Sequence, residues 1–115
     1  MTYVDGFITP VPNEKKHEYV EYSTTMGKIF KSHGALSWVQ CWADEVPDPG
    51  NTSFIKAVKC EPNESVCFAW ITWPSKEARN RAMAAFREEM QERETPQLFD
   101  QSRMIVGGFE TVVSL

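Results

Sequence analysis

The sequence lacks most of the features that mark a membrane, secreted or nucleic-acid-binding protein. It has no run of about 18 consecutive apolar residues, the length that a membrane-spanning helix needs. The residues after Met1 contain neither a basic segment nor a long apolar one, so we expect no signal peptide. The formal net charge is −4, from 12 basic and 16 acidic residues, which gives no basic surface for nucleic acid.

Cysteine is scarce, and its spacing excludes most sites that depend on it. The three cysteines, Cys41, Cys60 and Cys67, contain no CxxC pair, which predicts free thiols in a reducing cytoplasm. Neither histidine lies near a cysteine in the sequence, so we expect no zinc site. A glycine-rich phosphate loop and a recognised nucleophile motif are also missing. The sequence therefore predicts no metal and no resident cofactor.

The sequence does contain more strands with two apolar faces than its two helices can cover. Two segments have apolar residues at helical spacing, Glu14–His33 and Lys76–Glu92. Four segments are typical of strands with apolar residues on both faces: Tyr3–Thr9, Leu36–Ala43, Val66–Trp73 and Met104–Val113.

Several single residues set the expected ends of these elements. Pro10 is expected to stop the first strand, because proline has no N–H to donate to a sheet. Asn13 and Ser75 are expected to cap the N-termini of the two helices, since their side chains can accept hydrogen bonds from free backbone N–H groups. Gly34 is expected to end the first helix in the left-handed conformation.

The order of elements predicts a single α+β domain over residues 1–115 with a ferredoxin-like split β-α-β arrangement. The expected sheet has four antiparallel strands, with the first and third in the centre, and right-handed crossovers place both helices on one face. Two helices, each about 10 Å across, cover only that face. Because monomers rarely expose a large apolar patch, we expect a homodimer that covers the second sheet face, a dimeric α/β barrel.

Short sequence blocks also resemble the bacterial YbaA-like family, a group of unknown function within the dimeric α/β-barrel superfamily. The blocks occur in order along nearly the whole chain: Tyr3–Phe7 with Pro10–Pro12, His33–Leu36, Thr52–Phe54 with Ala57–Lys59, Phe99–Asp100, Arg103–Ile105 and Gly107–Glu110.

The resemblance implies the fold and a homodimer, but no activity. This sequence differs from the family pattern at Ile55, Val106, Trp38 and Trp73, and these differences would change the lining of a nearby pocket. Superfamily relatives include cofactor-free monooxygenases, haem-dependent enzymes, ligand-binding domains and stress-response dimers. Such breadth means that the fold alone does not fix the function.

Two titratable side chains are candidates for catalysis. Asp5 lies in the middle of the first predicted strand, where a buried carboxylate has to be hydrogen-bonded, paired or protonated. It is either a general base or ligand anchor, or a structural group that pairs with Arg103 or contacts a dimer interface. His33 lies at the end of the first helix and is either a base or metal ligand, or a cation that interacts with the helix dipole.

Aromatic and cationic residues are candidates for ligand binding. Trp38 and Trp70, two of the four tryptophans, either line a pocket for an aromatic molecule or fill a core or dimer interface. Tyr19 and Tyr22 either offer hydroxyl groups to such a pocket or pack in the core. Arg103 either binds an anionic ligand or makes a surface salt bridge.

Two function hypotheses follow from these residues. The first is a homodimer that binds a small molecule or a partner without catalysis of its own, because no catalytic constellation is recognisable. The alternative is a cofactor-independent, monooxygenase-like enzyme that acts on an aromatic or quinone-like molecule, by analogy with the superfamily. Either function would be located where Asp5, the tryptophans and His33 meet the sheet, under the helices or at the dimer interface.

Overall fold

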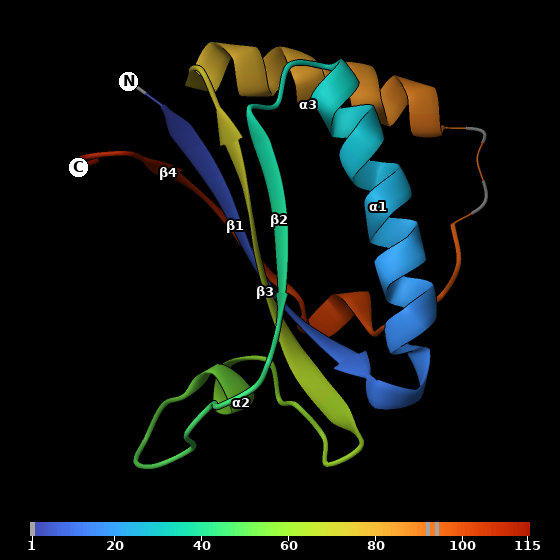
Figure 1. The fold of residues 1–115 in the computed structure, drawn as a ribbon, viewed down its shortest axis with the longest axis vertical. Coiled ribbons are helices and arrows are strands. Elements are labelled where there is room, and N and C mark those ends of the chain that lie inside the picture. The colour runs from blue at the N-terminus through green and yellow to red at the C-terminus, as the bar shows by residue number, and fades with distance from the viewer. Residues whose placement is uncertain (1, 92, 94) are drawn as a thin grey trace.

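A four-stranded antiparallel sheet runs through the middle of the computed structural model, which describes residues 2–91, 93 and 95–115 (Figure 1). The strand order is β2-β3-β1-β4, so the first and third strands are central, as predicted. The α+β, ferredoxin-like fold class is confirmed. The strands are β1 (Tyr3–Pro12), β2 (Ser37–Trp42), β3 (Glu64–Trp73) and β4 (Ile105–Glu110).

Two long helices, α1 (Lys16–Ser32) and α3 (Lys76–Met90), lie on one side of this sheet (Figure 1). The side chain of Ser75 caps α3 by accepting a hydrogen bond from the backbone N–H of Ala78, as expected. Gly34 follows α1 with a φ of 106°, the left-handed conformation that glycine adopts at low cost. The predicted end of the second helix, at Glu92, lies outside the described residues.

Asn13 does not cap α1, contrary to the sequence-based expectation. It begins a short 3-10 turn (Asn13–Lys15) that makes no side-chain capping bond, and α1 starts after that turn. The Asn13 side chain instead accepts a hydrogen bond from the Ser65 hydroxyl group, and its backbone N–H donates to Asn63 O at 2.9 Å. The residue therefore holds the end of β1 against the start of β3.

Pro10 does not stop β1, because the strand continues through Pro12, opposite Glu64 of β3. β4 pairs with β1 only as far as Ile8, so the last residues of β1 have a single strand neighbour. On the free side of a strand, a proline nitrogen without hydrogen costs no sheet hydrogen bond. The predicted strand Met104–Val113 is also shorter, since β4 ends at Glu110.

Aromatic side chains fill the layer between the helices and the sheet. The ring of Phe30, on α1, stacks on Phe86 of α3 and on Trp38 of β2, with centroids 4.3 and 5.2 Å apart. It also meets the fully buried Trp73 of β3 edge to face at 6.1 Å. Such contacts add to the free energy gained from apolar burial. One ring thereby joins both helices to both adjacent strands.

The opposite face of the sheet stays largely uncovered within one chain. Its apolar side chains include Phe68, Ile105 and Phe109, which are 44%, 43% and 59% exposed. The short helix α2 (Phe54–Ala57) lies on this side (Figure 1), where the Phe54 ring packs against Phe68 with centroids 5.9 Å apart. This segment covers only part of the face, which we call the open sheet face.

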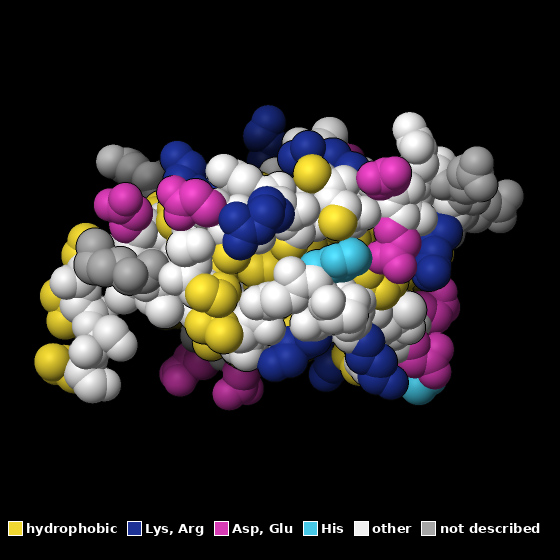
Figure 2. All heavy atoms as spheres, turned by 90° about the horizontal axis from the view of Figure 1, so that it is seen from above, with side chains coloured by type: hydrophobic (Ala, Val, Ile, Leu, Met, Phe, Trp, Pro, Cys, Tyr) yellow, Lys and Arg dark blue, Asp and Glu magenta, His cyan; other side chains and the backbone are white. Residues whose placement is uncertain are grey.

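Charged side chains of both signs are spread over the end of the molecule seen from above (Figure 2). Apolar side chains show between them, and neither sign dominates this surface (Figure 2). Among the described residues, no helix combines the length and apolarity that crossing a membrane requires.

Candidate functional site

The buried carboxylate of Asp5 is held by neighbouring side chains. Its Oδ2 accepts a hydrogen bond from Trp73 Nε1 at 2.9 Å, and Arg79 Nε lies 3.4 Å from Oδ1. The same guanidinium donates from Nη2 to the Tyr3 hydroxyl at 2.9 Å, and its centre lies 4.8 Å from the Tyr3 ring centroid. The partner of Asp5 is therefore Arg79 of α3 and not Arg103. A buried charge that is paired and hydrogen-bonded in this way is a structural element.

Gly108 of β4 provides the space for the half-buried guanidinium of Arg79 beside the buried Asp5. A Cβ atom built on Gly108 would lie 2.5 Å from Arg79 Nη2 and would also collide with the Tyr3 hydroxyl group. Only a residue without a side chain lets β4 pass this close to the guanidinium.

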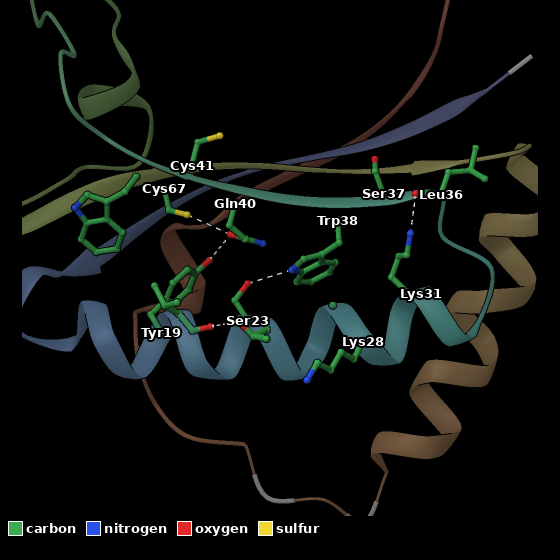
Figure 3. Close-up of a pocket in the computed structure, with 14 residues that line it drawn as sticks. Tyr19, Ser23, Lys28, Lys31, Leu36, Ser37, Trp38, Gln40, Cys41 and Cys67 are labelled. Carbon is green, nitrogen blue, oxygen red and sulfur yellow. Dashed lines mark hydrogen bonds between the residues drawn. The ribbon is translucent and has the colours of Figure 1, made fainter.

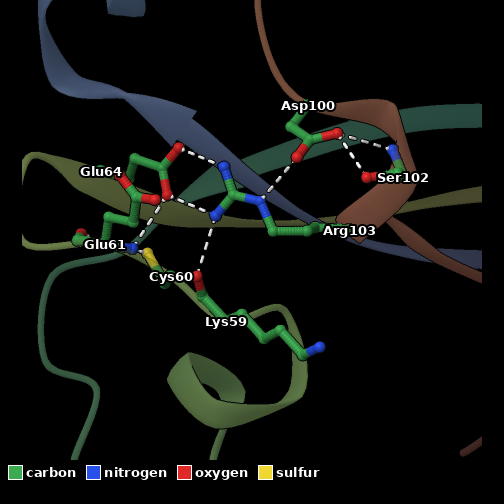
Figure 4. A network of polar contacts seen from close by, with 7 residues as sticks. All are labelled: Lys59, Cys60, Glu61, Glu64, Asp100, Ser102 and Arg103. Carbon is green, nitrogen blue, oxygen red and sulfur yellow. Dashed lines mark hydrogen bonds and ion pairs between the residues drawn. The ribbon is translucent and has the colours of Figure 1, made fainter.

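Arg103 is bound to the protein through all three of its nitrogens (Figure 4). Nη1 and Nη2 donate to the two carboxylate oxygens of Glu64 at 2.7 Å each, and Nε donates to Asp100 at 3.0 Å. Nη1 also donates to the backbone oxygen of Lys59 at 2.8 Å. The hydrogen bonds from Arg103 are the main cause that lowers the pKa of Glu64. The arginine thus joins the 3-10 turn Gln101–Arg103 to the start of β3.

The remaining predicted candidates lie apart from one another. His33 follows α1, and its Nε2 lies 3.1 Å from the Glu89 carboxylate of α3, so it links the two helices. Trp70 pairs with Val39 and lies on the open sheet face, where its ring packs against Phe68 at 5.6 Å. Val39, the partner of Trp70, faces the open side of the sheet. Trp38 precedes it in β2 and therefore lies on the helix side, because neighbouring residues of a strand point to opposite faces.

Two cavities meet at Trp38. The first, which we call the α1–β2 groove, has a volume of about 840 Å³ and lies between α1 and the edge strand β2 (Figure 3). The second, the inner cavity, has a volume of about 370 Å³ and lies between the helices and the sheet. Four of the described residues line both spaces: Tyr19, Ser23, Trp38 and Gln40.

A short polar chain lies where the two spaces meet. The Tyr19 hydroxyl and the Cys67 thiol both donate to Gln40 Oε1, at 3.0 and 3.2 Å (Figure 3). Burial is the largest cause that raises the pKa of Tyr19 well above its ordinary value, and burial also raises the pKa of Cys67. Both groups are therefore neutral hydrogen-bond donors at neutral pH.

Small residues of α1 make room for the indole of Trp38. A Cβ atom on Gly27 would lie only 2.5 Å from Trp38 Cδ1, so the ring contacts the helix where a side chain is missing. One turn earlier, the Ser23 hydroxyl accepts a hydrogen bond from Trp38 Nε1 at 3.2 Å. The indole is thus fixed by Ser23 on one side and stacked on Phe30 on the other.

This arrangement has the composition of a ligand-binding site. Aromatic and aliphatic side chains form most of the walls, and a few polar groups are in fixed positions. Neither Asp5 nor His33 is among the described residues that line the two spaces. Within the described part of the chain, no group of three or more His, Cys, Asp or Glu side chains is arranged to hold a metal ion.

Sequence reasoning missed Ser23 and Gln40. Gln40 is a polar residue between Trp38 and Trp42 on one face of a strand, which is unusual for a position that faces a core. Ser23 and Gly27 follow Tyr19 at intervals of four residues, so the apolar stripe of α1 contains two small residues in succession. Together, these signals mark a place where the helix cannot fill the space above the strand.

Comparison with known proteins places this chain in a family. The sequence profile described as "Protein of unknown function (DUF1428)" matches residues 2–101. The chain is 46% identical over 115 residues to the uncharacterized protein YbaA of Escherichia coli strain K12, covering 98% of each chain. The chain belongs to the DUF1428 family. YbaA of Shigella flexneri matches with the same identity and coverage, which confirms the resemblance inferred from the sequence blocks.

The fold also matches a more distant protein of known structure. The crystal structure of a putative antibiotic biosynthesis monooxygenase from Bacillus cereus superposes with a TM-score of 0.60, covering 100% of this chain and 95% of that one. The sequence identity is 15%, so the likeness extends to the fold alone. Neither the family description nor the names of the relatives gives an activity.

We predict that Gly108→Ala destabilises the protein by about 2 kcal/mol, because the added methyl group forces the Tyr3–Arg79 pair to move. Urea unfolding monitored by tryptophan fluorescence measures the change. Gly107→Ala is the matched control, since its Cβ would meet only the Phe109 ring, at 3.1 Å, and that ring is exposed enough to rotate. Equal losses in the two variants would contradict the role given to Gly108.

We predict that Arg103→Met lowers the midpoint of urea unfolding at pH 7 and makes this midpoint change less as the pH falls. Because Arg103 lowers the pKa of Glu64, this carboxylate stabilises the fold above its unfolded pKa, and the stabilisation is lost as the pH falls through the lower folded pKa. Midpoints measured between pH 7 and pH 3 should therefore converge for wild type and variant. Arg87→Met, at an exposed site of α3, controls for the lost charge, and parallel curves for wild type and Arg103→Met would refute the prediction.

Proposed function

We propose that the protein is a cytoplasmic homodimer that binds a small molecule with an apolar body in the α1–β2 groove and the inner cavity, without catalysis of its own. The observation that carries the proposal is the group of four residues shared by the two spaces, in which Trp38 supplies a flat apolar wall and Gln40 a fixed polar group. Aromatic walls with a few fixed polar groups are typical of small-molecule sites. The three free thiols support a reducing compartment.

The open sheet face supports the homodimer. Phe68, Ile105 and Phe109 leave an apolar surface that the helices of the same chain cannot reach. A second copy placed sheet against sheet would cover equivalent surfaces of both chains by a twofold axis. It would leave the α1–β2 groove accessible, because the groove lies on the helix side of the sheet.

The alternative function is a cofactor-independent, monooxygenase-like enzyme that acts on an aromatic or quinone-like molecule. It is favoured by the inner cavity, which occupies the space between helices and sheet in a fold shared with the Bacillus cereus protein. Its difficulty is that the two tyrosines that line this cavity, Tyr19 and Tyr22, have pKa values raised by burial and stay protonated at neutral pH, so neither can accept a proton. Oxygen consumption with a reduced quinone that is lost in Tyr19→Phe would support the enzyme.

We predict that Thr24→Trp lowers the affinity for the neutral fluorescent probe N-phenyl-1-naphthylamine at least about tenfold. Thr24 is an exposed residue of α1 that lines the groove, so a tryptophan side chain at this position would block the groove. A fluorescence titration measures the binding. Thr25→Trp is the matched control, since Thr25 is also exposed and each threonine hydroxyl donates to the carbonyl four residues earlier. Equal affinity in both variants would place the binding site elsewhere.

We predict that the wild-type protein has twice the 13.2 kDa chain mass in solution and that Phe109→Asp is monomeric, because a carboxylate on the open sheet face would be desolvated in the interface. Multi-angle light scattering at micromolar concentration gives the mass. Val20→Asp introduces the same charge at a 50% exposed site on α1 and should remain dimeric. A monomeric wild type would disprove the homodimer.

A further inference from the structure

The charges around the α1–β2 groove differ from those of the chain as a whole. The protein has more acidic than basic residues, 16 against 12, yet two lysines and no carboxylate are among the described residues that line the groove. The lysines are Lys28 and Lys31, three positions apart and therefore neighbours on the surface of α1. Glu18 and Glu21 of the same helix line a separate pocket beside Tyr22. The helix thus has these two lysines on the face toward the groove and these two glutamates on the face toward the other pocket.

The lysine ammonium groups retain hydrogen-bonding capacity for a ligand. Lys31 Nζ donates to the backbone oxygen of Leu36 at 3.0 Å, which holds it across one end of the groove (Figure 3). An ammonium group has three N–H bonds, so two remain on Lys31. Lys28 is exposed and lies one helical turn nearer the Ser23 position. The Lys28 side chain extends away from β2 (Figure 3), so its flexible stem has to rotate to bring the ammonium group to an anion bound by Lys31.

The amide of Gln40 adds a neutral donor inside the groove. In the structure the Gln40 atom that lies between Tyr19 and Cys67 is the acceptor oxygen, Oε1. The NH₂ group is then turned toward the Trp38 side of the groove (Figure 3). The polar groups that face the groove are therefore mostly donors and cations, which favour an acceptor-rich, negatively charged group on the ligand.

The walls of the groove favour a flat apolar body on the same ligand. Trp38 and Trp42 are two positions apart on β2, so their rings lie along one face of the strand. Lys16 Nζ lies 5.1 Å from the centroid of the Trp42 ring, so this indole already interacts with a cation. An aromatic body along the two indoles would have Lys31 near its Trp38 end.

We propose that the α1–β2 groove is selective for aromatic monocarboxylates, whose ring lies along Trp38 and Trp42 and whose carboxylate binds Lys28 and Lys31. This inference depends on the proposed ligand-binding function and adds the chemical class of the ligand. Charge-assisted hydrogen bonds from the ammonium groups favour a carboxylate over a neutral ligand of the same shape. Burial of the apolar ring adds affinity that does not depend on charge.

The test compares 2-naphthoate with the neutral 2-naphthamide, which has nearly the same shape, by tryptophan fluorescence quenching at low salt. Wild type should bind the acid about tenfold more tightly than the amide, as expected for two partly exposed cations. The double variant Lys28→Met/Lys31→Met should bind both probes with the affinity that wild type has for the amide. Lys76→Met, at an exposed site on α3, should keep the preference for the acid.

The outcomes separate this inference from the function on which it rests. If both probes bind wild type equally, or if the double variant keeps the preference for the acid, the groove binds ligands but the selectivity for carboxylates is refuted. If neither naphthalene probe nor N-phenyl-1-naphthylamine binds, the ligand-binding function is refuted as well. Loss of the preference at about 0.5 M salt in wild type would agree with the lysine contacts, since exposed charges are screened there.

Discussion

The structure depends on how two helices cover one face of a four-stranded sheet. Phe30 meets this requirement by touching α3, β2 and β3 at once through the rings of Phe86, Trp38 and Trp73. Large flat rings fill the layer beneath the middle of the helices, but they cannot fill all of it. Where α1 contains Ser23 and Gly27, the layer stays open toward β2. The candidate site is the part of the interface that the same packing leaves unfilled.

Buried charge also serves the fold on the helix-covered face, where Asp5 of β1 meets Arg79 of α3. Asp5 and Arg79 are brought together beneath β4 only because Gly108 has no side chain, and Trp73 completes the hydrogen bonding of the carboxylate. Arg103 does the same at the opposite end of the sheet, where its guanidinium holds Glu64 and Asp100. These groups resemble functional residues in a sequence because they are charged and lie in apolar segments. Their bonds to one another show that they position strands.

The sequence was sufficient to predict the strand order, both helices and the uncovered sheet face, since these follow from local hydrophobic periodicity and from handedness rules. It gave no reason to separate Trp38, which lies on the helix side of β2, from Trp70 on the open sheet face, because both faces of β3 are apolar. The ion-pair partners of charged side chains were less predictable. Asp5 binds Arg79 and not Arg103, a choice that depends on helix α3 crossing above β1 and that no local pattern in the chain encodes. Asn13 and Pro10 were misjudged for a related reason, since the end of β1 is set by its pairing with β3.

The central position of β1 has a consequence for how the chain acquires its structure. Tyr3 lies opposite Trp73 on one side and Glu110 on the other, so the first strand pairs with segments that are distant along the chain. Closing such long loops costs entropy before any contact stabilises them, and topologies of this kind fold more slowly than local ones. During synthesis β1 leaves the ribosome well before either neighbour exists. Its apolar side chains then have to remain in solution until β3 arrives, and the sheet gains its fourth strand only after β3 and α3 have been synthesised.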